Sequence, residues 1–297
     1  MSNKHRLLFI SFLITACRSA APPGMPGPGP RSGDSPANPP ELKHEITSWT
    51  IFPVAQEHHY TSVTTAVLES TGFSGASRDT VLSTIDFSLF IERNVVPASY
   101  SATIAAVSIR GGPRTAGSTL SPTNLSLPFI FTGRIEANRI TLDLPKLHTE
   151  TPASCSSEIL SAIPVIQRSL VLVPLQLRTG MAWTDSTRTS VCSGPLMVLL
   201  TSVRTYQVRG QTIARSRPVI LLEQQNRTSF TGDGTQEQHR IHVRGEGSGK
   251  AQLMVDAVSG DLIDTTSDHT TVLIVTSSGR DQRFTQTSRE SVTRADL

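Results

Sequence analysis

Alternation of apolar and polar side chains is the feature that most constrains this chain. Between residues 80 and 92, Val81, Ile85, Phe87, Leu89 and Ile91 occupy odd positions, and the even positions carry mostly Thr, Ser, Asp and Glu. A period of two places every second side chain on the same face of an extended strand. The pattern therefore predicts a half-buried β-strand, whose apolar face has to be covered by other elements.

The same pattern recurs in both halves of the chain, between segments typical of turns. Further predicted strands are Tyr60–Ser70, Tyr100–Arg110, Phe129–Glu136, Arg139–Leu144, Leu196–Val208, Val219–Gln224, Glu237–Gly245, Lys250–Ala257, Leu262–Thr266, Thr270–Thr276 and Arg283–Thr293. Turns are predicted at Ala137–Asn138, Gly232–Gly234, Gly245–Gly249, Ser259–Asp261 and Ser278–Arg280. A short helix is predicted over Ser154–Gln167, with Pro164 bending or ending it.

These elements predict a mainly β fold with local, antiparallel connections. The expected architecture is a large curved antiparallel sheet, a sandwich or an open half-barrel, with one short central helix covering one side. The lipoprotein-carrier folds, in which a curved half-barrel cups a helix, are an architectural analogy only. The β-rich body spans residues 41–297, and it is compatible with two similar halves, 41–150 and 194–297, joined by a helical segment, 151–193.

The N-terminus has the organisation of a secretory signal. Lys4, His5 and Arg6 precede the apolar run Leu7–Ile14, which is too short to span a bilayer because a spanning helix needs roughly 20 residues. The run ends in Ile14-Thr15-Ala16-Cys17. This ending resembles the lipobox of the bacterial lipoprotein family, in which an aliphatic residue and two small residues precede a cysteine. The alternative is an ordinary signal peptide with a chance cysteine.

The lipoprotein resemblance implies a site of modification and a location. Residues 1–16 would be the signal peptide, cleaved between Ala16 and Cys17, and the Cys17 thiol and its new amine would carry acyl chains (palmitate). Three chains would hold the protein on a membrane essentially irreversibly. Arg18 follows the cysteine, where an aspartate would favour the inner membrane. The resemblance therefore implies a lipid anchor in the outer membrane, with the body in the periplasm.

Residues 17–40 read as the lipidated cysteine followed by a tether. Eight of residues 18–40 are proline, with glycines between them, so the segment cannot bury a core. Loss of Lys4 and Arg6 with the signal lowers the formal net charge from +3 to +1. A chain so close to neutrality lacks the dense basic face expected of a nucleic-acid partner. Arginines gather between Arg204 and Lys250, and we interpret them as residues on the solvent-facing side of a sheet.

The remaining cysteines, Cys155 and Cys192, predict a disulfide, because exported proteins with two cysteines usually pair them. Free thiols and a metal site are the alternatives. A metal site is disfavoured, because neither cysteine has a second Cys or a His at ligand spacing. We therefore predict no metal and no cofactor.

No motif indicates catalysis, and no catalytic residue is assigned. The segment Gly245–Lys250 resembles a phosphate loop but lacks its first glycine and its final Ser/Thr, so it is interpreted as a hairpin turn. His239 and His242 fall on opposite faces of a strand, as do His58 and His59. Asp256, Asp261, Asp264 and Asp268 are too dispersed for a calcium loop.

Three functions from different classes remain open. The leading hypothesis is a non-enzymatic, lipid-anchored envelope protein, a binding or structural module that contacts another envelope protein. The second is a carrier or receptor for a lipid or other apolar ligand, whose cavity would be lined by Phe87, Phe90, Phe129, Phe131 and Trp183. The third is a hydrolase with a dispersed site. Trp183 belongs to Gly180–Asp185, a Gly-x-x-Trp-x-Asp element that resembles one in uncharacterised exported β-rich bacterial proteins.

Overall fold

The wall of the molecule is a closed β-barrel. A computed structural model describes residues 47–71, 76–93, 97–111, 128–143, 157–193, 196–236 and 239–295. Its elements are β1 (Ser48–Thr50), β2 (Glu57–Thr71), β3 (Ser77–Glu92), β4 (Ala98–Gly111), β5 (Phe129–Glu136), β6 (Arg139–Asp143), α1 (Ser157–Ser169), β7 (Gln176–Arg178), β8 (Ala182–Ser193), β9 (Leu196–Ala214), β10 (Arg217–Gln236), β11 (His239–Asp256), β12 (Leu262–Ser277) and β13 (Arg280–Arg294).

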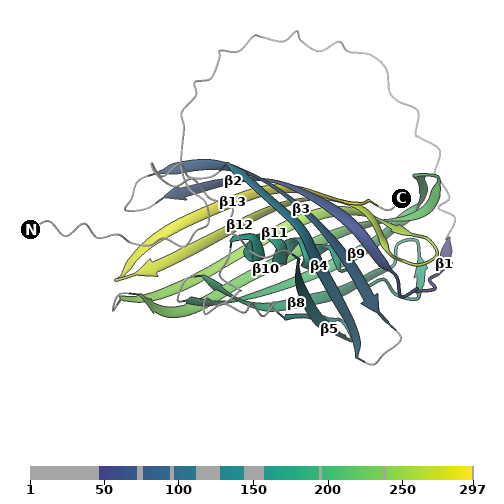
Figure 1. The fold of residues 1–297 in the computed structure, drawn as a ribbon, viewed down its shortest axis with the longest axis horizontal. Helices are drawn as coiled ribbons and strands as arrows, with labels where there is room; N and C mark the ends of the chain where they lie inside the picture. Colours follow the sequence, from purple (N-terminus) through teal and green to yellow (C-terminus); the bar gives the residue numbers. More distant parts are fainter. Residues whose placement is uncertain are drawn as a thin grey trace, which may run out of the picture.

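The strands close in the order β10-β11-β12-β13-β2-β3-β4-β5-β6-β8-β9, with β9 returning to β10. Neighbouring strands are antiparallel except β6 and β8, which pair in parallel over three residues, Arg139–Thr141 against Ser186–Arg188. Strands of both predicted halves share this one barrel (Figure 1). The mainly β prediction with one helix is confirmed, but the open half-barrel and the sandwich are wrong, because β13–β2 and β9–β10 pairing leaves no free sheet edge there.

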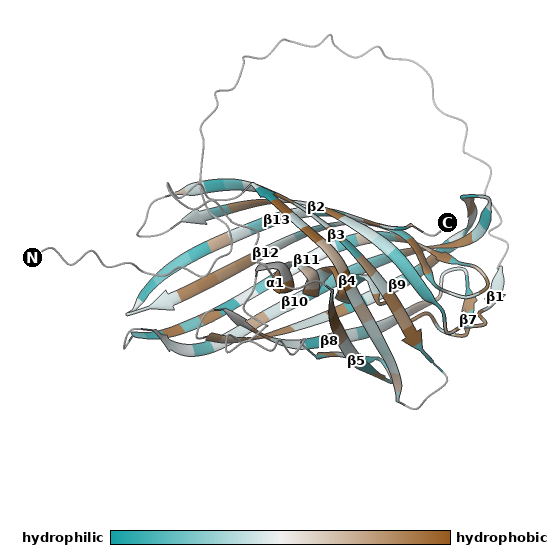
Figure 2. Cartoon of the chain, viewed as in Figure 1, coloured by the Kyte–Doolittle hydropathy of each residue, from teal (hydrophilic) through white to brown (hydrophobic). Residues whose placement is uncertain are grey.

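The helix α1 fills part of the lumen (Figure 2). Ile159, Ala162, Ile163 and Ile166 are at most 1% exposed and pack in one core with inward-facing residues of the strands. The helix continues two residues past the predicted end at Gln167, and Pro164 lies inside it without ending it. A helix with an apolar stripe satisfies its backbone internally, so it can fill a barrel without using the ladder of the wall.

The predicted turns divide into those confirmed and those that prove to be strand. Turns occur at Ala137–Asn138, at Ser278–Gly279 and before Gly260, whose φ of +75° suits glycine. Gly232–Gly234 and Gly245–Gly249, however, lie within β10 and β11, which pair along their whole length. The prediction of a hairpin at Gly245–Lys250 was therefore wrong.

The glycines of β11 serve close packing on the inner face of the wall. A Cβ atom at Gly249 would lie 2.0 Å from Nδ1 of His269, and one at Gly245 would lie 2.7 Å from Cδ2 of Leu273. Glycine in a strand interior often marks such a close approach. Side chains of β12 thus occupy the space above these glycines. The run of glycines that suggested a turn is a stretch of strand whose inward positions carry no side chain.

The outer face of the wall is mostly polar, with single apolar side chains among the polar ones. On β11 the outward positions are all exposed up to Gln252, and they are Arg240, His242, Arg244, Glu246, Ser248, Lys250 and Gln252. On β5 the exposed positions are Ile130, Thr132, Arg134 and Glu136, which alternate with buried Phe129, Phe131, Gly133 and Ile135. Among the described residues, no helix is long and apolar enough to cross a membrane.

Candidate functional site: charged contacts that hold the helix in the barrel

The best-defined polar site is a buried ion pair beside the C-terminal end of α1. Asp185 of β8 and Arg204 of β9 are cross-strand partners whose side chains face the lumen, at 2% and 1% exposure. Arg204 donates from Nε to Asp185 Oδ1 (2.6 Å) and from Nη2 to Asp185 Oδ2 (2.8 Å). This two-point geometry is the strong form of an arginine–carboxylate contact.

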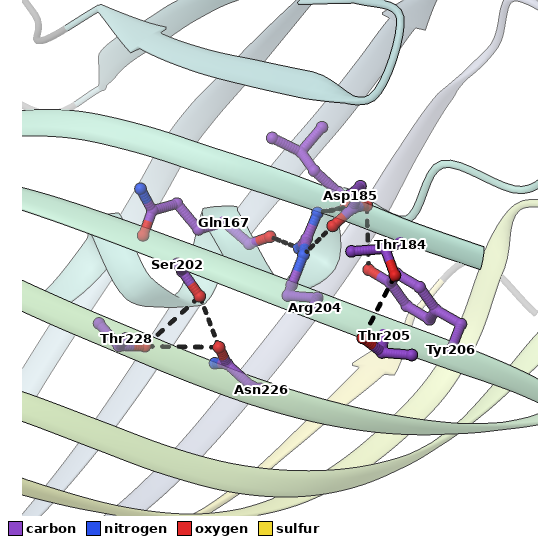
Figure 3. Close-up of polar contacts among 10 residues, drawn as sticks. Gln167, Thr184, Asp185, Ser202, Arg204, Thr205, Tyr206, Asn226 and Thr228 are labelled. Atoms are coloured by element: carbon purple, nitrogen blue, oxygen red, sulfur yellow. Dashed lines mark hydrogen bonds and ion pairs between the residues drawn. The ribbon is translucent and has the colours of Figure 1, made fainter. Parts of the chain in front are cut away.

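The same guanidinium binds the C-terminal end of α1. Arg204 donates from Nη1 to the carbonyl of Gln167 and from Nη2 to the carbonyl of Leu170, the latter at 2.9 Å (Figure 3). Carbonyls at a helix C-terminus lack partners within the helix, and the helix dipole favours a cation there. One side chain of the wall therefore fixes where the helix ends.

Aromatic neighbours complete this ion pair. Tyr206 donates its hydroxyl to Asp185 Oδ2 (3.2 Å), and its ring stacks on Trp183 with centroids 4.9 Å apart. Burial raises the pKa of Asp185, while the Arg204 guanidinium acts in the opposite direction. Burial alone would lower the pKa of Arg204, but Tyr206 and Asp185 raise it. We describe the pair as ionised, because Arg204 and Tyr206 donate three hydrogen bonds to the Asp185 carboxylate.

A second charged contact holds the other side of the helix end. Arg168 of α1 forms an ion pair with Glu290 of β13, which also accepts a hydrogen bond from Ser62 Oγ of β2 (3.0 Å). Next to Arg168, Gln167 donates from Nε2 to Thr189 Oγ1 of β8 (2.8 Å). Contacts from β8, β9 and β13 thus converge on residues 167–170, and β2 supports Glu290 from behind.

His269 of β12 lies near this second contact on the inner face. Burial and then the positive charge of Arg168 lower its pKa to about 3. The imidazole is therefore neutral near pH 7. Its Nε2 is buried and makes no hydrogen bond within the described part of the chain.

Ser62 lies beside the Glu290 carboxylate, but the two residues are only 1% and 2% exposed, so a substrate has no access to this contact. The Asp185 and Arg204 groups are occupied by each other and by the helix, which is the arrangement of a structural contact. His58 pairs with Asp261 (3.1 Å), which joins β2 to the turn before β12, and this pair shares a small cavity with Ser169 and Val171. In the described ranges, three or more His, Cys, Asp or Glu side chains nowhere converge as metal ligands would.

The residues predicted to line an apolar cavity lie in different environments. Phe87, Phe129 and Phe131 are 0–4% exposed and belong to the packed core that includes α1. Trp183 is partly buried against the same core and stacks on Tyr206. Phe90 alternates with Leu89 and so points to the outer face, half-buried. The structure therefore brings three of the five together as core.

Sequence reasoning missed the charged contacts at the helix end. It placed Arg204 with the solvent-facing arginines, which is wrong, although Arg209, Arg227, Arg240 and Arg244 are indeed exposed. The missed signal was the phase of β9, since Arg204 shares the parity of Leu200, Tyr206 and Val208 and must face inward with them. Cys17 and Cys155 lie outside the described residues.

Fold and site together define a closed β-barrel with an internal helix held by buried charges. No protein-family model matches the chain, and no curated protein is similar to it. Among solved structures, Pseudomonas aeruginosa OccK2 (OpdF), determined in complex with glucuronate, aligns with 81% of this chain and 98% of its own, at 8% identity and a TM-score of 0.21. A similarity of that size carries no argument about function.

Proposed function

We propose that this protein is a lipid-anchored, non-enzymatic module of the cell envelope, whose barrel works in water as a rigid binding or structural body. The polar outer face of the barrel is the observation that carries the proposal. A barrel that spans a membrane needs an outward apolar band about 25 Å tall. On β11 every outward side chain from Arg240 to Gln252 is polar or charged and exposed, which supports a barrel surrounded by water.

The anchor follows from combining this surface with the N-terminal sequence. A water-facing barrel is held at a membrane only by something outside its wall, and the lipobox ending in Cys17 supplies such a group. Arg18 in place of an aspartate favours the outer membrane, and we propose the periplasmic side for the body. The proposed partner is therefore the membrane through the lipid, together with another envelope protein that binds the barrel.

The interior supports a module over a carrier. A carrier needs an apolar cavity, whereas Phe87, Phe129 and Phe131 belong to one core of buried side chains together with the helix. The charged groups around residues 167–170 hold the helix and are occupied by one another, so they do not form an available catalytic pair. Hydrolysis by the purified protein that is abolished by one point substitution would overturn the non-enzymatic proposal.

Labelling of the intact chain tests the anchor. We expect radiolabelled palmitate to enter the wild-type protein and an increase in mass of an acylated, signal-cleaved chain. Cys17→Ser should abolish the label and release the protein from membranes after a carbonate wash. Palmitate incorporation into Cys17→Ser, or an unmodified Cys17 in the mature wild type, would contradict the proposal.

The Cys155–Cys192 disulfide stays a prediction and has its own test. Protein taken from the periplasm should show no thiol reactive to an alkylating reagent before reduction and two afterwards. In the chain-entropy model, closing a loop of this size contributes about 4 kcal/mol to stability. Two thiols that react before reduction would rule the disulfide out.

A further inference from the structure

The exposed large apolar residues form two groups. On the barrel wall they are single outward positions, 39–55% exposed, and they are Val63, Leu82, Ile130, Met197 and Val203. At the end of the barrel that carries β1 and β7 they are 56–76% exposed, and they are Phe52, Val54, Leu175, Ile213 and Val258. The second group is called the basal apolar patch. Its members are more exposed than the large apolar side chains on the wall.

Backbone contacts bring the segments of this patch together. Ile51 N donates to the carbonyl of Leu175 and Phe52 N to the carbonyl of Val258, both at 2.7 Å. Trp49 Nε1 donates to Gln211 Oε1 (2.7 Å), which ties β1 to the end of β9 that carries Ile213. The patch therefore combines four segments that are distant in sequence, at the end of the barrel that carries β1 (Figure 1).

Positive charge surrounds the patch. Arg178 ends β7, and Arg215 and Arg217 belong to the β9–β10 hairpin; all three are exposed. The neighbouring acids have internal partners. Asp256 Oδ1 accepts from the backbone N–H of Val258 (2.8 Å) and of Ser259 (2.9 Å), and Asp261 pairs with His58. Three exposed arginines therefore accompany the apolar centre, with Asp256 as a carboxylate in the turn that carries Val258; arginines beside exposed apolar side chains suit an anionic lipid surface.

The chain also reaches the barrel at this end. β1 begins at Ser48, so residues 18–47 join Cys17 to the basal end of the barrel. A proline-rich chain extends by at most about 3.1 Å per residue, so a linker of this composition keeps the barrel within about 100 Å of the cysteine. If Cys17 is in a bilayer, the tether presents the basal patch to the same bilayer at high effective concentration, so a weak surface affinity is enough.

We propose that the basal apolar patch, with Arg178, Arg215 and Arg217, docks on the surface of an anionic phospholipid bilayer. The barrel then stands on the membrane by this end, and the β10–β11 and β12–β13 hairpins point away from it, free to meet a partner. The proposal rests on the proposed lipid anchor for bringing this end to the bilayer. The surface contact itself is independent of the lipid and is tested without it.

Vesicle binding by a chain that starts at residue 18 tests the contact alone. The barrel strands and the core that the structure describes lie within residues 49–294, so this chain keeps all of these residues. We expect this chain to co-sediment with vesicles containing phosphatidylglycerol. Phe52→Asp with Val258→Asp should weaken that binding at least tenfold, and the matched wall variant Ile130→Asp with Val203→Asp should bind as the parent does. No binding by the parent, or equal losses in both variants, would overturn the proposal.

Fluorescence of the intact lipidated chain gives a second test that needs no destabilising change. Phe52→Trp and Ile130→Trp are compared in vesicles containing brominated lipids, each against the wild-type signal. Quenching of the tryptophan at position 52 and not at position 130 is expected. Equal quenching at both positions, or none at position 52, would overturn docking by this end, while the mass of the acylated chain reports on the anchor separately. A dimer of the anchor-free chain that is lost on Phe52→Asp would assign the patch to a second copy instead.

Discussion

The two faces of β9 carry the same ionic contact in opposite environments. On the inner face Arg204 pairs with Asp185, and both side chains are at most 2% exposed; on the outer face Arg209 pairs with Glu223, and both are 48% exposed. The inner guanidinium also binds two backbone carbonyls of the helix end. The outer pair is screened by water and joins only two neighbouring strands.

The difference teaches what each charge does for the fold. An exposed ion pair contributes little, because water and salt weaken the attraction and two long side chains lose freedom. A buried pair is costly to place but also costly to break, since the remaining charge has no solvent. The inner pair therefore specifies where the helix sits, and every prediction below compares an inner position with an outer one.

The largest difference is expected on removal of one carboxylate from each pair. Asp185→Ala should lower the free energy of unfolding by about 3–5 kcal/mol, because Arg204 is left charged and buried. Glu223→Ala should lower it by at most about 1 kcal/mol. Urea denaturation followed by circular dichroism measures both. Similar losses in the two variants would mean that Arg204 is not the contact that holds the helix.

The inner pair also shows what sequence could predict. Alternation gave the strands and the mainly β class, because a period of two is a local property. Closure of the barrel depends on pairing β13 with β2 and β9 with β10, and no local pattern in a single sequence specifies which strand ends a sheet. The open half-barrel prediction failed at that step.

The failures at particular residues have a common cause. Arg204 and the glycines of β11 were judged by residue type, as a surface charge and as turn formers. Their position in the alternation places them on the inner face with the buried residues. There Asp185 pairs with Arg204, and the ring of His269 occupies the space beside Gly249. Residue type predicts the average environment, whereas position in the alternation predicts the face.

Gly249 tests the close packing inferred for the inner face. Gly249→Ala should lower the free energy of unfolding by up to about 3 kcal/mol, because the new Cβ would meet the ring of His269 and the backbone carbonyl of Asp268. Ser248→Ala, the adjacent outward position, serves as the control and should change it by less than about 0.5 kcal/mol. Equal stability of the two variants would show that the wall yields easily at this point.

His269 predicts how stability depends on pH. Its folded pKa of about 3 lies below the ordinary value of 6.5, so the unfolded chain binds the proton more readily. Stability contributed by the neutral histidine is complete above pH 6.5 and is lost as the pH falls toward 3. Between pH 7 and pH 5 the loss should be about 2 kcal/mol. His269→Gln should flatten this dependence, and His242→Gln on the outer face should leave it in place; an unchanged slope in His269→Gln would contradict the assignment.

The smallest change in the free energy of unfolding is expected for a charge added to the outer face. A change close to zero would itself indicate that this face contacts water. Val203 is 44% exposed on β9, between the inward positions Ser202 and Arg204. If the wall faces water, Val203→Lys should change the free energy of unfolding by less than about 0.5 kcal/mol, measured without detergent. If the wall instead faced lipid, a lysine there would cost about 2–4 kcal/mol, since hydrocarbon cannot solvate the ammonium group. A large loss of unfolding free energy in Val203→Lys would show that the outer face of the wall contacts lipid and not water. The barrel would then be held in a membrane by its own wall, without the lipid at Cys17.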